Sequence, residues 1–289
     1  MPTRPTSGAV AIIPARLQST RLPEKALQDL GGAPLVVRVL ERARQAASLE
    51  AVWVATDSER IADAVRAAGG EAILTRSDHP SGLDRVAEAT ARLKDLTRRA
   101  SQADGVRDPD LAADPIVLNV QGDEPFLNPA GLDHLVRLFE RPEVRMATLA
   151  APFAPTDDPS DPNRVKVVLD RKGKALYFSR ALIPHGARPD HDKGGSDTKG
   201  DPGAEGDYRP LLHVGIYAYR LATLRELAAL EPAPLERTER LEQLRALYNG
   251  IDIHVAVGDY HSIGIDTPED LAKARTRWEG GVMRGGAGR

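Results

Sequence analysis

The sequence predicts an α/β fold in which a doubly wound, mostly parallel sheet carries a smaller antiparallel subdomain. Up to Leu74, three short apolar runs alternate with two helical patterns, the spacing of parallel strands joined by right-handed crossovers. Residues 116–120 are apolar apart from Asn119, which is typical of a strand buried on both faces of such a sheet. Asp170–Gly173 is a hairpin signal between two further strand patterns, and it predicts the antiparallel part.

Each predicted strand is an apolar or alternating run, and each predicted helix has apolar side chains at a helical period. The strands are expected at 10–13, 51–55, 71–74, 116–120, 146–152, 164–168, 174–178, 211–219, 251–257 and 263–266. The helices are expected at 34–46, 58–68, 84–96, 129–139, 221–230, 234–248 and 268–278. Ser58 can cap the second helix, and either Ser81 or Asp84 can cap the third.

The pattern changes after residue 155, and this change divides the chain. Residues 98–114 lack an apolar period, which predicts a surface insertion. Residues 186–207 are rich in Gly, Asp, Lys and Pro, which predicts a mobile segment that buries little apolar surface. The expected parts are an α/β core at 8–155, the antiparallel subdomain at 156–262, a return to the core at 263–279, and loose termini at 1–7 and 280–289.

The composition argues against several classes of protein. A net charge of −3 disfavours binding to nucleic acid or a membrane surface through a broad basic face. The chain has no cysteine, which excludes disulfides and thiolate metal sites and fits a reducing compartment. The sequence shows no secretory pattern, and no apolar run approaches the roughly 20 residues that span a bilayer. We therefore expect a soluble, cytoplasmic protein that binds neither nucleic acid nor membranes.

A cationic loop follows the first strand. Pro14 interrupts the apolar run, and Arg16, Arg21 and Lys25 come after it. Cations at the carboxyl end of a strand in an open α/β sheet suit a polyphosphate, the usual ligand at that edge. An ordinary βα loop with solvated side chains is the alternative, and the spacing alone does not separate the two.

Asp123 is a candidate metal ligand. It follows the buried strand closely, and Gly122 beside it would allow the backbone to approach a ligand. Mg²⁺ prefers carboxylate oxygens together with waters and substrate phosphates, so an Asp at this edge of the sheet can bind it. The simpler alternative is a turn-forming Asp before Glu-Pro.

Asp266 is the second candidate. Pro268 prefers the first helical position, which makes Thr267 the N-cap, and Asp270 then stands where the partner in a capping box is expected. Asp266 is therefore not needed to cap the helix, and it is available to a metal at the end of the preceding strand.

An ordered series of motifs extends from about Ala9 to Ala274. It includes Ile13-Pro-Ala-Arg16, Ser19-Thr-Arg-Leu-Pro23, Ala55-Thr-Asp57, Asn119-Val-Gln-Gly-Asp-Glu-Pro125, Leu176-Tyr-Phe-Ser-Arg180, His213-Val-Gly-Ile-Tyr217, Leu241-Glu-Gln-Leu-Arg245 and Gly264-Ile-Asp-Thr-Pro-Glu-Asp270. The series resembles the 3-deoxy-D-manno-octulosonate (Kdo) cytidylyltransferases, or CMP-Kdo synthetases. The resemblance implies a Rossmann-like nucleotidyltransferase fold. It also implies the reaction of CTP with Kdo to give CMP-Kdo and pyrophosphate, for lipopolysaccharide biosynthesis.

The resemblance further implies roles for single residues. Arg16 and Lys25 would hold the triphosphate, while Asp123 and Asp266 would bind Mg²⁺ and assist attack of the sugar hydroxyl on the α-phosphate. The nucleotide would be bound in the core by Ala15, Arg16, Lys25, Ser81, Gly82 and Gln121. The sugar would be bound in the subdomain by Arg180, His213, Tyr217, Glu239 and Gln243. For His213 and Tyr217, a packed pair in the core is an equal alternative. The subdomain would also form a homodimer.

Three features depart from the family pattern: Glu24, Leu83 and the long segment at residues 186–207, which falls near the expected sugar site and dimer face. Glu24 stands where the family has glycine, and a carboxylate beside a triphosphate is repulsive unless it points outward. Leu83 stands where the family has threonine. The alternatives are a CMP-8-amino-Kdo synthetase, a CMP-sialic acid synthetase, or a catalytically idle nucleotide-binding module. Sialic-acid enzymes carry a glycine-containing opening loop, and the presence of both aspartates with Lys25 favours an enzyme.

Overall fold

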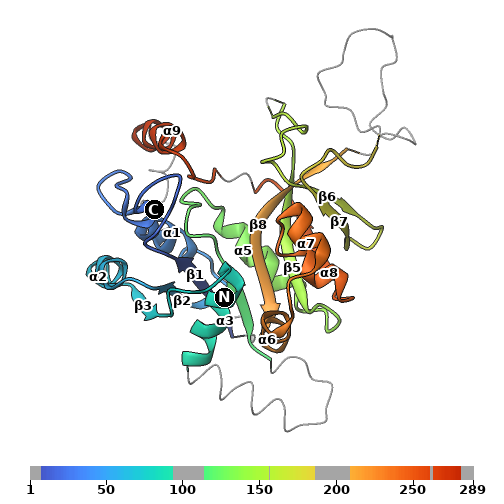
Figure 1. The fold of residues 1–289 in the computed structure, drawn as a ribbon, viewed down its shortest axis with the longest axis horizontal. Helices are drawn as coiled ribbons and strands as arrows, with labels where there is room; N and C mark the ends of the chain where they lie inside the picture. The colour runs from blue at the N-terminus through green and yellow to red at the C-terminus, as the bar shows by residue number, and fades with distance from the viewer. Residues whose placement is uncertain (1–7, 94–113, 156, 186–208, 261–262, 281–289) are drawn as a thin grey trace, which may run out of the picture.

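The computed structural model describes residues 8–93, 114–155, 157–185, 209–260 and 263–280. The strands within these residues are β1 (Ala9–Ala15), β2 (Leu49–Thr56), β3 (Glu71–Leu74), β4 (Ile116–Asn119), β5 (Met146–Pro152), β6 (Lys166–Leu169), β7 (Ala175–Ser179), β8 (Leu211–Arg220) and β9 (Ile253–Val257). They form one sheet in the order β3-β2-β1-β4-β8-β5-β9, and the β6–β7 hairpin joins it by pairing β6 with β8 (Figure 1).

Strand directions confirm the predicted doubly wound sheet. The pairs β1–β2, β1–β4, β2–β3 and β5–β9 are parallel, whereas β8 runs antiparallel to both β4 and β5. The helices are α1 (Leu35–Ala43), α2 (Glu59–Ala67), α3 (Gly82–Arg92), α5 (Pro129–Leu138), α6 (Leu221–Ala229), α7 (Pro234–Glu239), α8 (Leu244–Tyr248) and α9 (Pro268–Glu279), with a 3₁₀ turn, η1, at Lys25–Leu27.

Helices cover both faces of the sheet. Alternate side chains of β1 show the division, since Ala11 and Ile13 pack with α1, α2 and α5, whereas Val10 and Ile12 pack with α3, α6 and α8. A strand with apolar side chains on both sides is stable only where both faces are buried. The site must therefore lie at an edge of the sheet, where loops replace helices.

The strand β8 alters the predicted domain organisation. It belongs to the expected subdomain 156–262, yet it lies between β4 and β5 in the middle of the main sheet. Its side chains are apolar toward both helical layers, with Ile216 and Ala218 on one face and Tyr219 on the other. Burial on both faces requires a central position, so residue 156 is not a boundary of the sheet. The small antiparallel part is the β6–β7 hairpin with the start of β8.

The helix α9 closes the chain against its beginning. Leu271 and Ala274 of α9 pack with Leu22, Leu30 and Leu35 in a small third cluster that also includes Phe126 and Ile265. Figure 1 shows α9, in red, beside the blue loop that follows β1. This packing brings the segment before α9 to the carboxyl ends of β1 and β4.

Two predicted elements are wrong. The helix expected at 234–248 is divided into α7 and α8, because Arg240 has a left-handed φ of +55° that ends α7. Residues 263–266 form no strand, and Ile265 donates one hydrogen bond to the Asp123 carbonyl (3.0 Å). The predictions for 98–113, 186–207, 1–7 and 281–289 lie outside the described residues.

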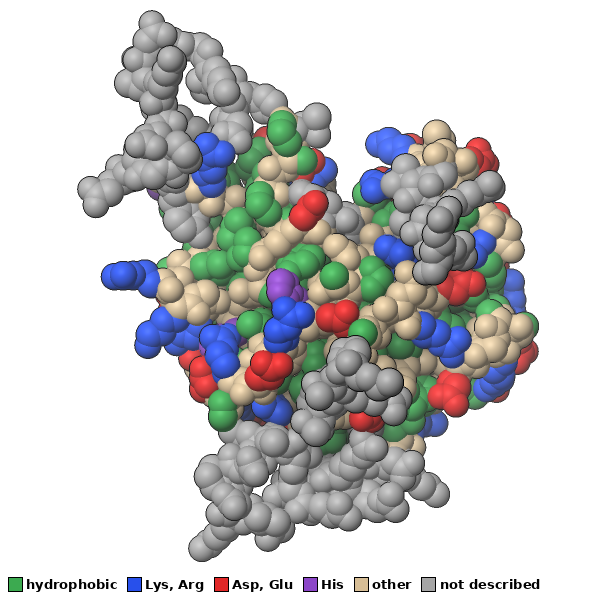
Figure 2. Space-filling model, turned by 180° about the vertical axis from the view of Figure 1, so that it is seen from behind, with side chains coloured by type: hydrophobic (Ala, Val, Ile, Leu, Met, Phe, Trp, Pro, Cys, Tyr) green, Lys and Arg blue, Asp and Glu red, His purple; other side chains and the backbone are tan. Residues whose placement is uncertain are grey.

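The surface carries charges of both signs. On the face seen in Figure 2, Lys and Arg side chains are interspersed with Asp and Glu, without a broad basic area. Among the described helices, none is long and apolar enough to cross a membrane.

Candidate active site

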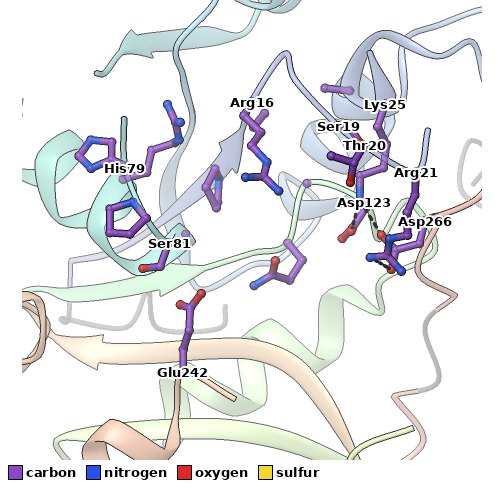
Figure 3. Close-up of a pocket in the computed structure, with 18 residues that line it drawn as sticks. Arg16, Ser19, Thr20, Arg21, Lys25, His79, Ser81, Asp123, Glu242 and Asp266 are labelled. Carbon is purple, nitrogen blue, oxygen red and sulfur yellow. Dashed lines mark hydrogen bonds and ion pairs between the residues drawn. The ribbon is translucent and has the colours of Figure 1, made fainter. Parts of the chain in front are cut away.

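A cleft lies at the carboxyl ends of β1 and β4. Its first lobe has a volume of about 390 Å³ and lies between the loop after β1, the turn before α3 and the segment after β4. In Figure 3, Arg21, Lys25 and the two aspartates occupy one end of this lobe, His79 and Ser81 occupy the other, and Arg16 lies between the two ends. The lining includes every residue predicted to bind the nucleotide: Ala15, Arg16, Lys25, Ser81, Gly82 and Gln121.

A second lobe of about 420 Å³ adjoins the first on the side of β8. Three of the predicted sugar-binding residues line it, namely Arg180, Tyr217 and Gln243. The two lobes have five lining residues in common: Gly82, Gln121, Asp123, Glu242 and Asp266. A ligand in one lobe would thus meet a ligand in the other beside the two aspartates.

Asp57, at the end of β2, holds two walls of the first lobe together. Its Oδ1 accepts a hydrogen bond from the Leu17 N–H of the opening loop (3.1 Å), and its Oδ2 pairs with Arg85 of α3 (3.2 Å). Both side chains of the ion pair are almost fully buried, and Arg85 also donates to the Thr75 hydroxyl (2.6 Å). Loss of either charge would leave the other buried without its partner.

Gly122 brings the chain after β4 close to the end of β1. A Cβ at this position would lie 2.8 Å from the Pro14 carbonyl oxygen, so only glycine allows the approach. The sequence predicted this glycine for close approach to a ligand, whereas the structure shows a close approach to the neighbouring strand. The consequence is that Asp123 faces the opening loop.

Lys25 links the two aspartates. Its Nζ lies 2.6 Å from Asp123 Oδ2 and 2.9 Å from Asp266 Oδ1, while Arg21 Nη2 lies 3.0 Å from Asp266 Oδ2 (Figure 3). Burial alone would lower the pKa of Lys25, but the charges and hydrogen bonds of the two carboxylates outweigh it and raise that pKa above the ordinary value. The ammonium group is therefore held charged between two acids from distant parts of the chain.

Glu24, the carboxylate that would repel a triphosphate if it faced the cleft, points out of the cleft. Its backbone is left-handed, with φ of +48°, and its carboxylate forms a two-pronged ion pair with Arg60 of α2, one contact being 2.8 Å. The carboxylate is thus neutralised on the outside of the loop. It does not line either lobe.

The structure does not bring His213 and Glu239 to the lining of either lobe. Glu239 accepts hydrogen bonds from the Ser179 hydroxyl (2.6 Å) and the Arg180 N–H (2.9 Å). The His213 ring packs between Phe178 and Tyr217, and burial lowers the pKa of His213 to about 3. Both residues support the wall from behind, which for His213 agrees with the alternative of a packed pair.

Comparisons with known proteins agree with this geometry. A family model described as cytidylyltransferase matches residues 10–253. The chain belongs to the cytidylyltransferase family. A 3-deoxy-manno-octulosonate cytidylyltransferase of Syntrophotalea carbinolica is 44% identical over 271 residues, which cover 93% of this chain and 98% of that protein. The predicted resemblance is thereby confirmed, and the chain is a nucleotidyltransferase.

Solved structures support the same assignment. A CMP:2-keto-3-deoxy-manno-octonic acid synthetase complexed with CTP aligns with a TM-score of 0.77 at 37% identity, covering 96% of this chain and all of that one. A 4-diphosphocytidyl-2C-methyl-D-erythritol synthase from Anaerococcus prevotii aligns with a TM-score of 0.54 at 14% identity. The second likeness shows the fold alone.

Two site residues of this cytidylyltransferase were missed by sequence reasoning. Glu242 lines both lobes and is exposed to the cleft, and desolvation by the surrounding walls raises its pKa above the ordinary value. Asn119 is 2% exposed, and its Oδ1 has no hydrogen-bond partner among the described residues, as is true of Gln243 Nε2. Both residues line the second lobe, so these two polar atoms can bond to a ligand there. The signals were present: Glu242 adjoins Gln243 in one motif, and Asn119 is the polar residue of an apolar strand.

The cytidylyltransferase has a donor set that fits Mg²⁺. Among the described residues, no group of three or more His, Cys, Asp or Glu side chains is arranged as a metal site. Asp123 and Asp266 nevertheless direct carboxylate oxygens to one cationic group, so they can also share one divalent ion. Mg²⁺ is commonly bound by one or two carboxylates with waters and substrate phosphates completing the shell.

Proposed function

We propose that this cytidylyltransferase joins CTP and Kdo to give CMP-Kdo and pyrophosphate, the activation step of Kdo for lipopolysaccharide biosynthesis. The observation that carries the proposal is the two-lobed cleft, whose lobes meet at Asp123 and Asp266. A reaction between two substrates needs both held at one point, and positioning of this kind supplies a large part of the rate. The relative at 44% identity is named for the same substrate.

In this proposal the first lobe binds the triphosphate and the second lobe binds the sugar. In the first lobe, Arg16 and Lys25 bind the triphosphate and offset the charge that develops on pyrophosphate as it leaves. Arg180 can pair with the sugar carboxylate in the second lobe, and Asn119 and Gln243 have buried polar atoms for its hydroxyls. The anomeric hydroxyl then attacks the α-phosphorus in line. The new P–O bond forms as the bond to pyrophosphate breaks, and the hydroxyl proton passes to water.

Mg²⁺ is the proposed cofactor, held by Asp123 and Asp266. When bound, it neutralises phosphate charge and makes a coordinated hydroxyl more acidic. The chain also keeps the hydroxyl and the α-phosphate together, since the residues shared by the lobes come from loops fixed by Asp57 and by the packing of α9. His213 is not proposed as a general base, because it does not line either lobe and burial lowers its pKa to about 3, which makes the imidazole a weak base.

We also propose a cytoplasmic homodimer. CTP is made inside the cell, and a chain without cysteine suits that compartment. For the dimer, Leu176 of β7, Tyr248 of α8 and Val257 of β9 are exposed apolar residues on elements that contact one another. Exposed apolar areas of this kind are typical of interfaces.

A pyrophosphate-release screen tests the reaction. CTP, UTP, ATP and GTP would each be combined with Kdo, 8-amino-Kdo and sialic acid, with and without Mg²⁺. We expect release only with CTP, Kdo and Mg²⁺ together. Preference for 8-amino-Kdo or sialic acid would correct the sugar, and absence of release from every combination would favour an idle nucleotide-binding module.

The metal assignment has its own test. Asp123→Asn should reduce turnover by roughly 10²-fold or more, because one oxygen ligand and its charge are removed from the reacting centre. Circular dichroism should show an unchanged fold. Asp252→Asn is the matched control, since Asp252 pairs with Lys174 away from the cleft (2.9 Å) and should keep normal turnover. Normal turnover of D123N would contradict the assignment.

A further inference from the structure

The two acids proposed to bind the metal are already bound to cations of the chain. Lys25 contacts both Asp123 and Asp266, and Arg21 contacts the remaining oxygen of Asp266. These three ion pairs lie at the same end of the first lobe (Figure 3). The acids therefore form a neutralised cluster rather than an open carboxylate pair.

Lys25 and a metal ion compete for one place. The ammonium lies 2.6 and 2.9 Å from the two carboxylate oxygens. Mg²⁺ sits at about 2.0–2.1 Å from its ligands, so an ion bound by the same two oxygens would have to lie between them, in the space that the ammonium fills. Two positive groups in that space would also repel each other. Entry of the metal thus requires the Lys25 side chain to move.

We propose that Lys25, assisted by Arg21, guards the two acids, so that the metal binds only together with the triphosphate that draws these cations away. The proposal rests on the proposed function, because it takes Asp123 and Asp266 as the metal ligands. Lys25 therefore has two alternative partners: the carboxylates, and the phosphates of the nucleotide. Exchange between them makes binding of metal and nucleotide mutually supportive, a coupling that acts equally in both directions.

The surrounding structure allows this exchange without rebuilding the loop. Glu24, immediately before Lys25, is tied to Arg60 on the outer side, and Asp57 holds the Leu17 N–H. The backbone of the loop is thus fixed from two sides. The movement needed is confined to the Lys25 side chain, a flexible stem whose compact ammonium can change partners by rotation about its own bonds.

Binding of Mn²⁺, as a paramagnetic substitute for Mg²⁺, tests the proposal without any turnover. Titrations of the full chain would be followed by electron paramagnetic resonance, with no nucleotide present. We expect weak binding to the wild type and binding tighter on the order of tenfold or more for Lys25→Met. Arg21→Gln should show a smaller gain. Because the Arg21 side chain is exposed, this variant should fold normally. Lys174→Met is the matched control, since Lys174 pairs with Asp252 outside the cleft, and it should bind as the wild type does.

A second arm adds CTP without sugar. We expect a signal from protein-bound Mn²⁺ with the wild type, and loss of this signal in the double variant D123N/D266N. Because the double variant is measured with the same CTP, it also gives the background from Mn²⁺ bound to CTP in solution. If the wild type without nucleotide binds Mn²⁺ as tightly as K25M, the guarding role is wrong while the metal site stands. If no condition gives Mn²⁺ binding that depends on the two aspartates, the metal site of the proposed function is wrong, and the guarding role with it.

Discussion

Glu24 has a left-handed backbone conformation just before the 3₁₀ turn η1. Left-handed backbone is unfavourable for a residue with a Cβ, typically by about 1 kcal/mol or more. The ion pair with Arg60 is exposed to solvent and offsets only a small part of this cost. The side chain thus lies on the outer side of the loop, beside Arg60.

Two variants of Glu24 separate these effects. Glu24→Gln loses the ion pair and keeps the unfavourable φ, whereas Glu24→Gly loses the ion pair and the backbone cost together. We expect E24G to be more stable than E24Q by about 1 kcal/mol. Urea unfolding would measure the difference. A more stable E24Q would show that the left-handed φ carries no cost at this site.

Glu242 predicts a dependence of stability on pH. The side chain is exposed to the cleft, but desolvation by the surrounding walls raises its pKa, and the Leu83 N–H and Arg245 do not fully compensate. The folded chain therefore holds the proton of Glu242 more tightly than the unfolded chain does. The protonated carboxyl favours the folded state at pH values below the ordinary pKa of 4.5, and this stabilisation is lost as the pH rises through the folded-state pKa. Glu242→Gln removes the ionisation. It should gain stability over the wild type at about pH 7.5 and gain less at about pH 4.5.

Urea unfolding of E242Q and wild type at both pH values measures this effect. An equal gain at the two values would show that packing, not ionisation, is responsible. The variant should also have altered activity, because Glu242 lines both lobes.

At the scale of elements, Asp57 couples β2, α3 and the opening loop. Asp57→Asn keeps an oxygen that can accept from the Leu17 N–H but loses the charge that pairs with Arg85. Asp57→Ala loses both. We expect each variant to be destabilised by about 3 kcal/mol, as for a broken buried pair. Only D57A should also weaken CTP binding strongly, since it alone frees the loop. Equal KM values for CTP in the two variants would contradict this role.

Elements with local signals were predicted well. The strands 71–74 and 146–152 agree with the structure at both ends, and the capping box of α9 forms as expected, with Asp270 N–H donating to Thr267 Oγ1 (3.1 Å). Ser81, not Asp84, caps α3. The division of the helix at 234–248 was missed because its apolar period continues across Arg240. A buried ion pair between Glu236 and Arg245 (2.7 Å) joins the two pieces, and that contact depends on the tertiary fold.

At the scale of the whole molecule, the C-terminal helix positions the second acid. Trp278 packs against Phe126 with ring centroids 6.1 Å apart, lies under the Arg38 guanidinium at 4.6 Å, and fills the space where a Cβ of Gly31 would be. Asp266 comes just before α9. The packing of α9 against the opening loop therefore determines the position of the Asp266 carboxylate relative to the Lys25 ammonium.

Trp278→Ala tests this link. We expect a loss of about 2 kcal/mol in stability, because the ring is only partly buried, together with lower turnover from a displaced Asp266. Thermal unfolding and the pyrophosphate assay measure the two effects. Leu235→Ala is the control, since the Leu235 side chain is exposed and lines neither lobe, and it should keep normal turnover. Unchanged turnover of W278A would separate α9 packing from the site.

The sequence by itself determined the doubly wound sheet and the edge at which the site lies, because apolar periods, turns and caps act over a few neighbouring residues. It also placed Lys25, Asp123 and Asp266 at that edge. Only the tertiary structure decided that β8 lies within the main sheet, that Glu24 faces Arg60, and that Lys25 bridges both acids. These outcomes depend on which distant groups meet once both faces of the sheet are buried, and no local pattern specifies them.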